Sequence, residues 1–142
     1  MQLKDLATLF DIEGIRWISL QLGPDASQLH ELPNTIEDVS THIGNFGDTA
    51  ALITCLDLVI SIDSAVAHLA GALGSPAWIM LKLAPDWRWF LDRSDSPWYS
   101  SLKLFRQIEF GNWQTVVADM SQQLKIILDK KSAKVKTTLP DT

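Results

Sequence analysis

The stretch DLVISIDSAVAHLAGALGSP, residues 57–76, decides the fold of this chain. It begins with LVISI at 58–62, a short apolar run rich in β-branched residues that is typical of a parallel strand covered on both faces. A run of small residues follows, with Ser64 as the expected N-cap and with Gly74 and Pro76 ending the helix. The stretch therefore predicts a buried strand, a tight turn and a helix.

The turn between this strand and this helix is a candidate anion site. The first N–H groups of a helix have no intrahelical partner and lie at the positive end of the helix dipole, so a phosphate meets donors already aimed at it. Ser64 and His68 are four residues apart and share one face of the helix, beside Asp63 and the amide of Ala65. The alternative is structural: Asp63 caps the turn and His68 packs against the sheet.

Short strands and helices alternate through the rest of the chain. Strands are predicted at 15–20, 36–43, 77–81 and 102–105, and helices at 3–10, 25–33, 48–56 and 86–91, with a long final helix after Asn112. This alternation predicts the α/β class, with a mostly parallel sheet, helices on both faces, and ligands bound outside the carboxyl ends of the strands.

Three polar segments follow predicted strands and are expected to meet at one crevice: Gln21–Asp25, Asp63–His68, and Lys82–Arg88, which includes Asp86. The last of them opens an aromatic segment, APDWRWFLDRSDSPWY at 84–99. Its tryptophans and arginines either shape a ligand pocket and hold a phosphate, or cover the end of the sheet with an arginine stacked on an indole. The sequence leaves both interpretations open.

Length and composition favour one domain outside the membrane. The chain has 142 residues, 46% of them hydrophobic, which is enough for one sizeable core. No apolar run is long enough to cross a bilayer and no signal-peptide pattern follows Met1, so we expect a cytoplasmic location. The single cysteine, Cys55, excludes an internal disulfide and is expected at a buried helix position.

Charge is unevenly distributed along the chain. Residues 1–129 carry eight Lys and Arg against sixteen Asp and Glu, whereas residues 130–142 carry four Lys and one Asp. The acidic part disfavours nonspecific nucleic-acid binding, which depends on neutralising phosphates. We therefore expect a ligand-binding domain at 1–129 and a Lys-rich flexible tail at 130–142.

Five further blocks occur in an order that resembles one enzyme family. They are SLQLGPD from Ser19, DTAALI from Asp48, APDWRW from Ala84, DSPWY from Asp95 and LFRQ from Leu104. Together with residues 57–76 they resemble the donor-binding segment of GT-B glycosyltransferases, especially the heptosyltransferase-like group and its relatives fused to tetratricopeptide repeats. The resemblance covers the chain to about Leu128 and implies a Rossmann-like three-layer domain, half of a GT-B fold.

The resemblance implies that the ligand is a nucleotide-diphosphate sugar. Ser64 and the amides around Ala65 would hold the diphosphate, His68 would donate to a phosphate oxygen, and Asp63 would face the sugar or orient the turn. Asp48 would lie near the nucleotide, although it is equally suited to be a helix N-cap. Fixed donors rather than a metal would stabilise the departing diphosphate, and no metal or other cofactor is expected.

One departure from the family concerns charge at the candidate site. Relatives often carry lysine after SLQ, where this chain has Leu22. We expect Lys82, at the end of the neighbouring strand, to supply the missing cation.

The chain has room for one half of a GT-B enzyme, so the acceptor-binding half is expected from elsewhere in a longer protein or from a partner chain. A homodimer that buries the orphaned interface is a further expectation. The competing interpretations are a noncatalytic nucleotide-binding module and a protein-interaction module.

Overall fold

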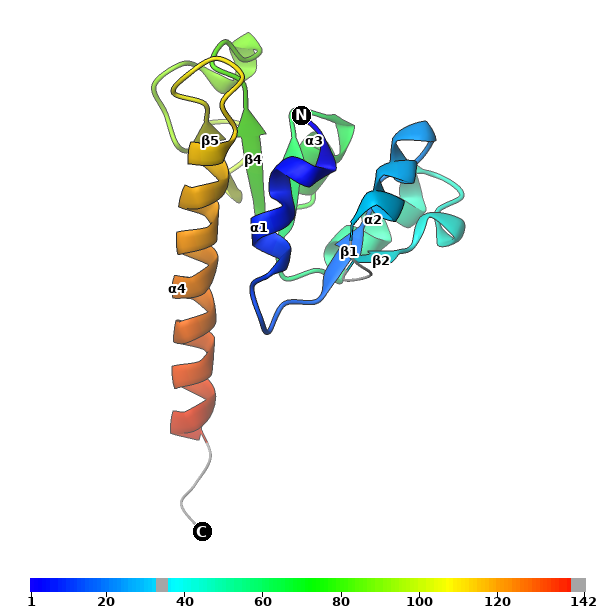
Figure 1. The fold of residues 1–142 in the computed structure, drawn as a ribbon, viewed down its shortest axis with the longest axis vertical. Coiled ribbons are helices and arrows are strands. Elements are labelled where there is room, and N and C mark those ends of the chain that lie inside the picture. Colours follow the sequence, from blue (N-terminus) through cyan, green and yellow to red (C-terminus); the bar gives the residue numbers. More distant parts are fainter. Residues whose placement is uncertain (33–35, 139–142) are drawn as a thin grey trace.

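The computed structural model describes residues 1–32 and 36–138, with side chains through Ala133. Figure 1 shows parallel strands flanked by helices, with a long C-terminal helix that extends beyond the body. In chain order the elements are η1 (Leu3–Leu6), α1 (Ala7–Phe10), β1 (Trp17–Ser19), η2 (Pro24–Glu31), β2 (Ile36–Asp38), η3 (Ser40–His42), α2 (Phe46–Thr54), β3 (Val59–Ile62), α3 (Ala65–Ala72), β4 (Ala77–Leu81), η4 (Trp87–Trp89), β5 (Leu102–Arg106) and α4 (Gln114–Thr138), where η marks a 3-10 helix.

The central sheet has the order β3-β4-β5 with all strands parallel. β4 lies in the middle and all five of its residues are buried, as its unbroken apolar sequence predicts. Successive side chains point to opposite faces of the sheet, so Ala77, Ile79 and Leu81 lie on one face. Trp78 and Met80 lie on the other face.

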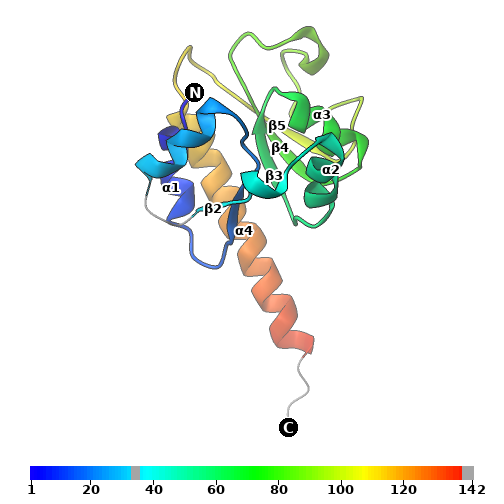
Figure 2. The same ribbon diagram turned by 90° about the vertical axis from the view of Figure 1, so that its right-hand side faces the viewer.

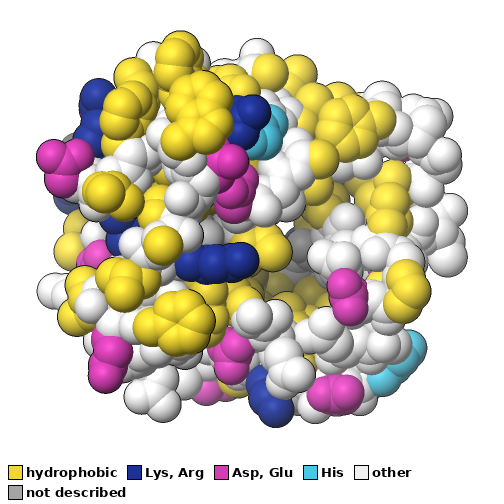
Figure 3. All heavy atoms as spheres, turned by 90° about the horizontal axis from the view of Figure 1, so that it is seen from above, with side chains coloured by type: hydrophobic (Ala, Val, Ile, Leu, Met, Phe, Trp, Pro, Cys, Tyr) yellow, Lys and Arg dark blue, Asp and Glu magenta, His cyan; other side chains and the backbone are white. Residues whose placement is uncertain are grey.

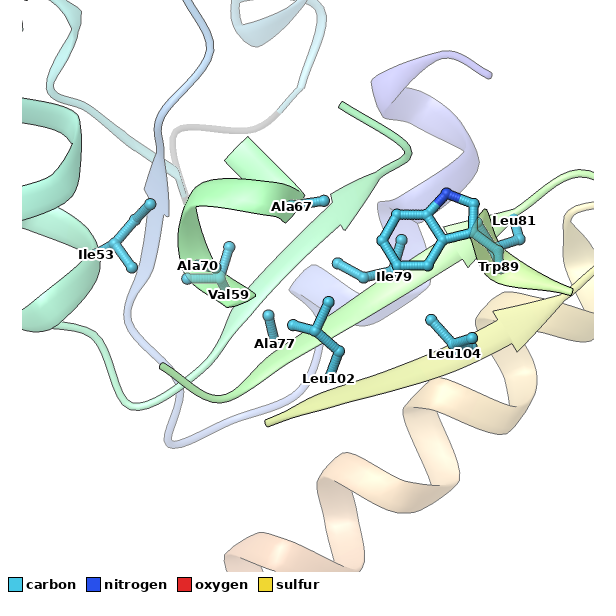
Figure 4. Close-up of a cluster of buried hydrophobic side chains, with 10 residues drawn as sticks. All are labelled: Ile53, Val59, Ala67, Ala70, Ala77, Ile79, Leu81, Trp89, Leu102 and Leu104. Carbon is cyan, nitrogen blue, oxygen red and sulfur yellow. The ribbon is translucent and has the colours of Figure 1, made fainter. Parts of the chain in front are cut away.

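Helices cover both faces of this sheet (Figure 2). On one face α2 and α3 pack through Ile53, Ala67 and Ala70, and the small residues of α3 allow close approach to the strands (Figure 4). On the other face α1 contributes Leu9 and α4 contributes an apolar stripe consisting of Val116, Val117, Met120 and Leu124. The predicted Rossmann-like α/β architecture of three layers is therefore confirmed.

The strands form two sheets rather than the single sheet that the alternation predicts. β1 and β2 are three residues each and pair in parallel with one another. The side chain of Trp17 packs against the hydrophobic cluster to which α1 and α4 contribute. The pair forms no hydrogen-bonded ladder with the central sheet and packs against it through side chains. The predicted helix end at Pro33 lies outside the described residues.

α4 is longer than predicted and crosses the boundary placed between residues 129 and 130. It continues without a break to Thr138, so the helix includes residues predicted as part of the tail, and the division into domain and tail stays a prediction. No glycine or proline interrupts this part of the sequence, and Lys131 Nζ forms an ion pair of 2.7 Å with Asp57 Oδ1. No helix of the described residues is long and apolar enough to cross a membrane.

Cys55 is exposed, which corrects the predicted burial. The helical stripe of α2 buries Ile53 instead, and Cys55 is the residue that ends the helix.

Candidate anion-binding site at the carboxyl end of the sheet

The predicted strand, turn and helix are present at the start of the site. β3 ends at Ile62, and the extended Ser64 is the N-cap of α3. The Ser64 hydroxyl does not cap the helix, however, and lies 2.9 Å from the hydroxyl of Ser61. The first N–H groups of α3 therefore donate no hydrogen bond to the N-cap side chain that usually accepts one.

His68 lies one turn into α3 at the edge of the site. Its Nε2 is 3.8 Å from Asp63 Oδ1, and its Nδ1 is 3.2 Å from the hydroxyl of Tyr99. The imidazole also stacks on Trp89, with the ring centroids 5.2 Å apart. The His68 side chain is 37% exposed, so it is held by aromatic rings while one nitrogen stays near the turn.

Tyr99 is a site residue that the sequence interpretation missed. It lies 31 positions after His68, in the segment just before β5, and only the folded chain brings the two together. The side chain of the buried Ser96 accepts a hydrogen bond from the Tyr99 backbone N–H at 3.3 Å. The sequence signals that could have found it are its place at the end of the aromatic segment and of the DSPWY block, and its being the single tyrosine of the chain.

Lys82, Asp86 and Arg88 lie in the segment after β4. Lys82 is exposed and forms no ion pair within the described part of the chain. Asp86 Oδ1 accepts hydrogen bonds from the backbone N and the guanidinium of Arg88, at 3.1 and 2.8 Å. The backbone hydrogen bond is the largest cause that lowers the pKa of Asp86, and His68 adds a smaller electrostatic effect. Asp86 and Arg88 are thus paired with each other.

Gln21 and Asp48 have local partners. The Gln21 amide donates to the Leu22 carbonyl at 3.2 Å. Asp48 accepts from the backbone N–H groups of Gly44 and Asn45, at 2.9 and 3.1 Å, and Asn45 is the N-cap of α2. Asp48 is therefore the third residue of a capping box rather than the N-cap that the sequence predicted.

In the aromatic segment, one tryptophan covers the end of the sheet, and two others are exposed, as a ligand-binding role would require. Trp89 is 1% exposed and covers the end of the sheet over Ile79 and Leu81 (Figure 4). Trp87 and Trp98 are 68% and 57% exposed. One tryptophan therefore belongs to the core, and two remain on the surface.

Exposed apolar side chains gather at the carboxyl ends of the strands. Figure 3 looks onto this end of the molecule and shows apolar groups interspersed with acidic and basic ones. We call these residues the strand-end surface. One residue ends β3, one is the first residue of α2, and the others lie in segments that follow β1, β4 or β5: Ile62, Phe46, Leu22, Leu83, Trp87, Leu91, Trp98, Ile108 and Phe110. Exposed apolar surface of this extent is typical of binding faces.

Two surface hollows lie elsewhere. One is between α1 and α4, and the other is beside Trp78 and Lys103 along α4. Among the described residues no three His, Cys, Asp or Glu side chains gather as metal ligands.

Comparison with known proteins finds similarity to glycosyltransferases in a segment that includes the β3–α3 turn. Residues 41–81 match glycosyltransferase family 9 (heptosyltransferase), a segment that runs from η3 to the end of β4. The chain is also 36% identical over 121 residues to Protein FlbA of Caulobacter vibrioides, which is 79% of this chain and 20% of that protein. The chain thus spans about a fifth of the length of this curated relative. No solved structure is significantly similar.

Proposed function

We propose that this chain is the donor-binding part of a glycosyltransferase and that it binds a nucleotide-diphosphate sugar at the β3–α3 turn. The observation that carries the proposal is the position of His68, whose side chain is 37% exposed and is held beside this turn, inside the segment that matches glycosyltransferase family 9. A helix N-terminus without a side-chain cap favours a bound phosphate, because its amides point at the ligand.

Each polar group of the turn then has one role. The amides at Ala65 and the Ser64 hydroxyl hold the diphosphate, while His68 Nε2 donates to a phosphate oxygen. Asp63 cannot accept from a phosphate, so it faces the sugar hydroxyls. These fixed donors stabilise charge on the departing diphosphate without reorganising during the reaction. Lys82 adds a positive charge from the end of β4.

The acceptor-binding half comes from another domain of a longer chain or from a partner. The strand-end surface supports this part of the proposal, because a domain that closes over the donor would cover its apolar residues. Alternatively, a second copy of this chain would cover the same surface in a homodimer. The isolated chain is expected to bind donor and to transfer sugar poorly. Its cytoplasmic location and its independence of metal remain predictions.

A second candidate function is a noncatalytic nucleotide-binding or protein-interaction module. The observation that favours it is the internal pairing of polar groups around the turn. Asp48 serves the start of α2, and Arg88 is paired with Asp86, so neither is held ready for a ligand.

A thermal-shift screen with ADP-, UDP-, GDP- and CMP-sugars tests these functions. Ligand that binds only the folded state adds about 2.7 kcal/mol of stability at one hundred times its Kd. Stabilisation that depends on the sugar supports the transferase, and stabilisation by the nucleotide alone supports the module. Loss of the shift in His68→Ala, with the shift kept in the matched control His42→Ala, would assign it to the turn. No shift with any nucleotide would contradict both nucleotide-binding functions.

A further inference from the structure

Tyr99 contacts the nitrogen of His68 that faces away from Asp63. The Tyr99 hydroxyl is 3.2 Å from His68 Nδ1, whereas Nε2 is 3.8 Å from Asp63 Oδ1. An ionised carboxylate only accepts hydrogen bonds, so Asp63 favours the neutral imidazole that carries its proton on Nε2. Nδ1 is then an acceptor, and the Tyr99 hydroxyl is the donor that reaches it.

Both rings are held in place by neighbours. The backbone N–H of Tyr99 donates to Ser96 Oγ at 3.3 Å, and its carbonyl accepts from the Leu102 N–H at 3.1 Å, where β5 begins. The imidazole of His68 stacks on the buried Trp89, at an interplanar angle of 25°. The backbone of Tyr99 is thus hydrogen-bonded on both sides, and its ring packs against the core cluster beside His68.

We propose that Tyr99 is a positioning residue, which holds the neutral imidazole of His68 with its Nε2–H directed at an incoming phosphate oxygen. The proposal rests on the proposed function, since it assumes a diphosphate at the β3–α3 turn. In the opposite tautomer Nε2 would present a lone pair to the phosphate and would repel it. Tyr99 acts through His68 and does not itself touch the ligand.

The first test is the nitrogen spectrum of the ligand-free protein at about pH 8.5, above the ordinary titration range of imidazole. The chain has three histidines, so His30 and His42 serve as internal references. We expect His68 Nε2 to be protonated and Nδ1 to be unprotonated and hydrogen-bonded. Tyr99→Phe keeps the ring and removes the donor, so the two nitrogen shifts should move toward each other as the second tautomer becomes populated.

Thr41→Val is the matched control, because the Thr41 hydroxyl lies 3.3 Å from His42 Nδ1. It should change the spectrum of His42 and leave that of His68 unaltered. A wild-type spectrum with His68 Nδ1 protonated would overturn the assignment of Tyr99, and so would a His68 spectrum that Tyr99→Phe leaves unchanged. The wild-type spectrum decides the tautomer even where the variant folds poorly.

The second test measures coupling between the two residues in ligand binding. The probe is whichever of ADP, UDP, GDP and CDP raises the wild-type melting temperature most, and its Kd is measured by calorimetry. We expect Tyr99→Phe to weaken binding about fivefold in the wild type and to add no loss in His68→Ala. Independent, additive losses would overturn the proposal. Absence of binding to all four nucleotides would overturn the proposed function. The contact of Tyr99 with His68 would then be tested by the nitrogen spectrum, which needs no ligand.

Discussion

The ring of Tyr99 occupies the space that a side chain at Gly71 would need. A Cβ at position 71 would lie 2.4 Å from Tyr99 Cγ and 2.7 Å from its Cδ1, which is closer than real Cβ contacts allow. Gly71 lies inside α3, where alanine normally favours the helix over glycine by about 1 kcal/mol. The glycine is therefore explained by the close approach of Tyr99 rather than by helix propensity.

Gly71→Ala should lower the free energy of unfolding by about 1–3 kcal/mol, because the overpacked ring must move away from α3. The same displacement should break the contact between Tyr99 and His68 and weaken nucleotide binding. Urea unfolding measures the first effect and calorimetry the second. A variant as stable as the wild type, or more stable, would mean that the two residues do not touch in solution.

The central sheet could be predicted from the sequence because buried parallel strands leave a strong local signal. The apolar run at 77–81 has the same bounds as β4, and the structure contains the strand, turn and helix predicted within 57–76. The long apolar stripe after Asn112 likewise predicts a helix, which is α4 in the structure. In each case the pattern that specifies the element lies within the element.

The remaining features depend on partners that are distant in the chain or on competing local signals. Tyr99 joins His68 only through the packing of the β5 segment on α3. At the start of α2 both Asn45 and Asp48 are good capping residues, and the structure uses them reciprocally. Continuation of α4 beyond residue 129 is accompanied by the ion pair of Lys131 with Asp57, 74 positions away.

Replacement by alanine should destabilise the protein strongly at Trp89 and hardly at all at Trp87. Trp89→Ala removes a ring that is 1% exposed and should cost about 3–5 kcal/mol of stability through the cavity it leaves. Trp87→Ala removes a ring that is 68% exposed and should change stability by no more than about 0.5 kcal/mol.

Under the transferase proposal, Trp87→Ala should instead weaken binding of a nucleotide sugar by roughly fivefold, about 1 kcal/mol, while leaving the nucleoside diphosphate unaffected. Thermal unfolding and calorimetry on the same two proteins separate the effects. Equal affinity of wild type and Trp87→Ala for the sugar donor would assign the exposed aromatic rings to a different partner.

Lys82 should act through its charge. Lys82→Ala is expected to weaken nucleoside diphosphate binding about three- to tenfold at low salt, and by less at high salt, because an exposed charge is screened. Lys125→Ala, which removes an exposed lysine from α4, is the matched control. If Lys82→Ala binds as the wild type does while His68→Ala binds weakly, Lys82 does not replace the cation missing at Leu22.

The ion pair between Arg93 and Asp95 should make the aromatic segment sensitive to acid. Arg93 donates to both carboxylate oxygens of Asp95, at 2.8 and 2.9 Å, and this hydrogen bonding is the largest cause that lowers the pKa of Asp95. A carboxyl whose pKa is lower in the folded state contributes stability above its unfolded pKa and loses it as the pH falls through the folded pKa. The contribution should therefore decline as the pH falls below about 4.

Asp95→Asn should accordingly lose less melting temperature than the wild type between about pH 5 and pH 2.5. Asp11→Asn is the control, since Asp11 is exposed and forms no ion pair in the described residues. It should keep the wild-type acid dependence. If Asp95→Asn and the wild type lose melting temperature in parallel over this range, the Arg93–Asp95 pair does not stabilise the folded segment.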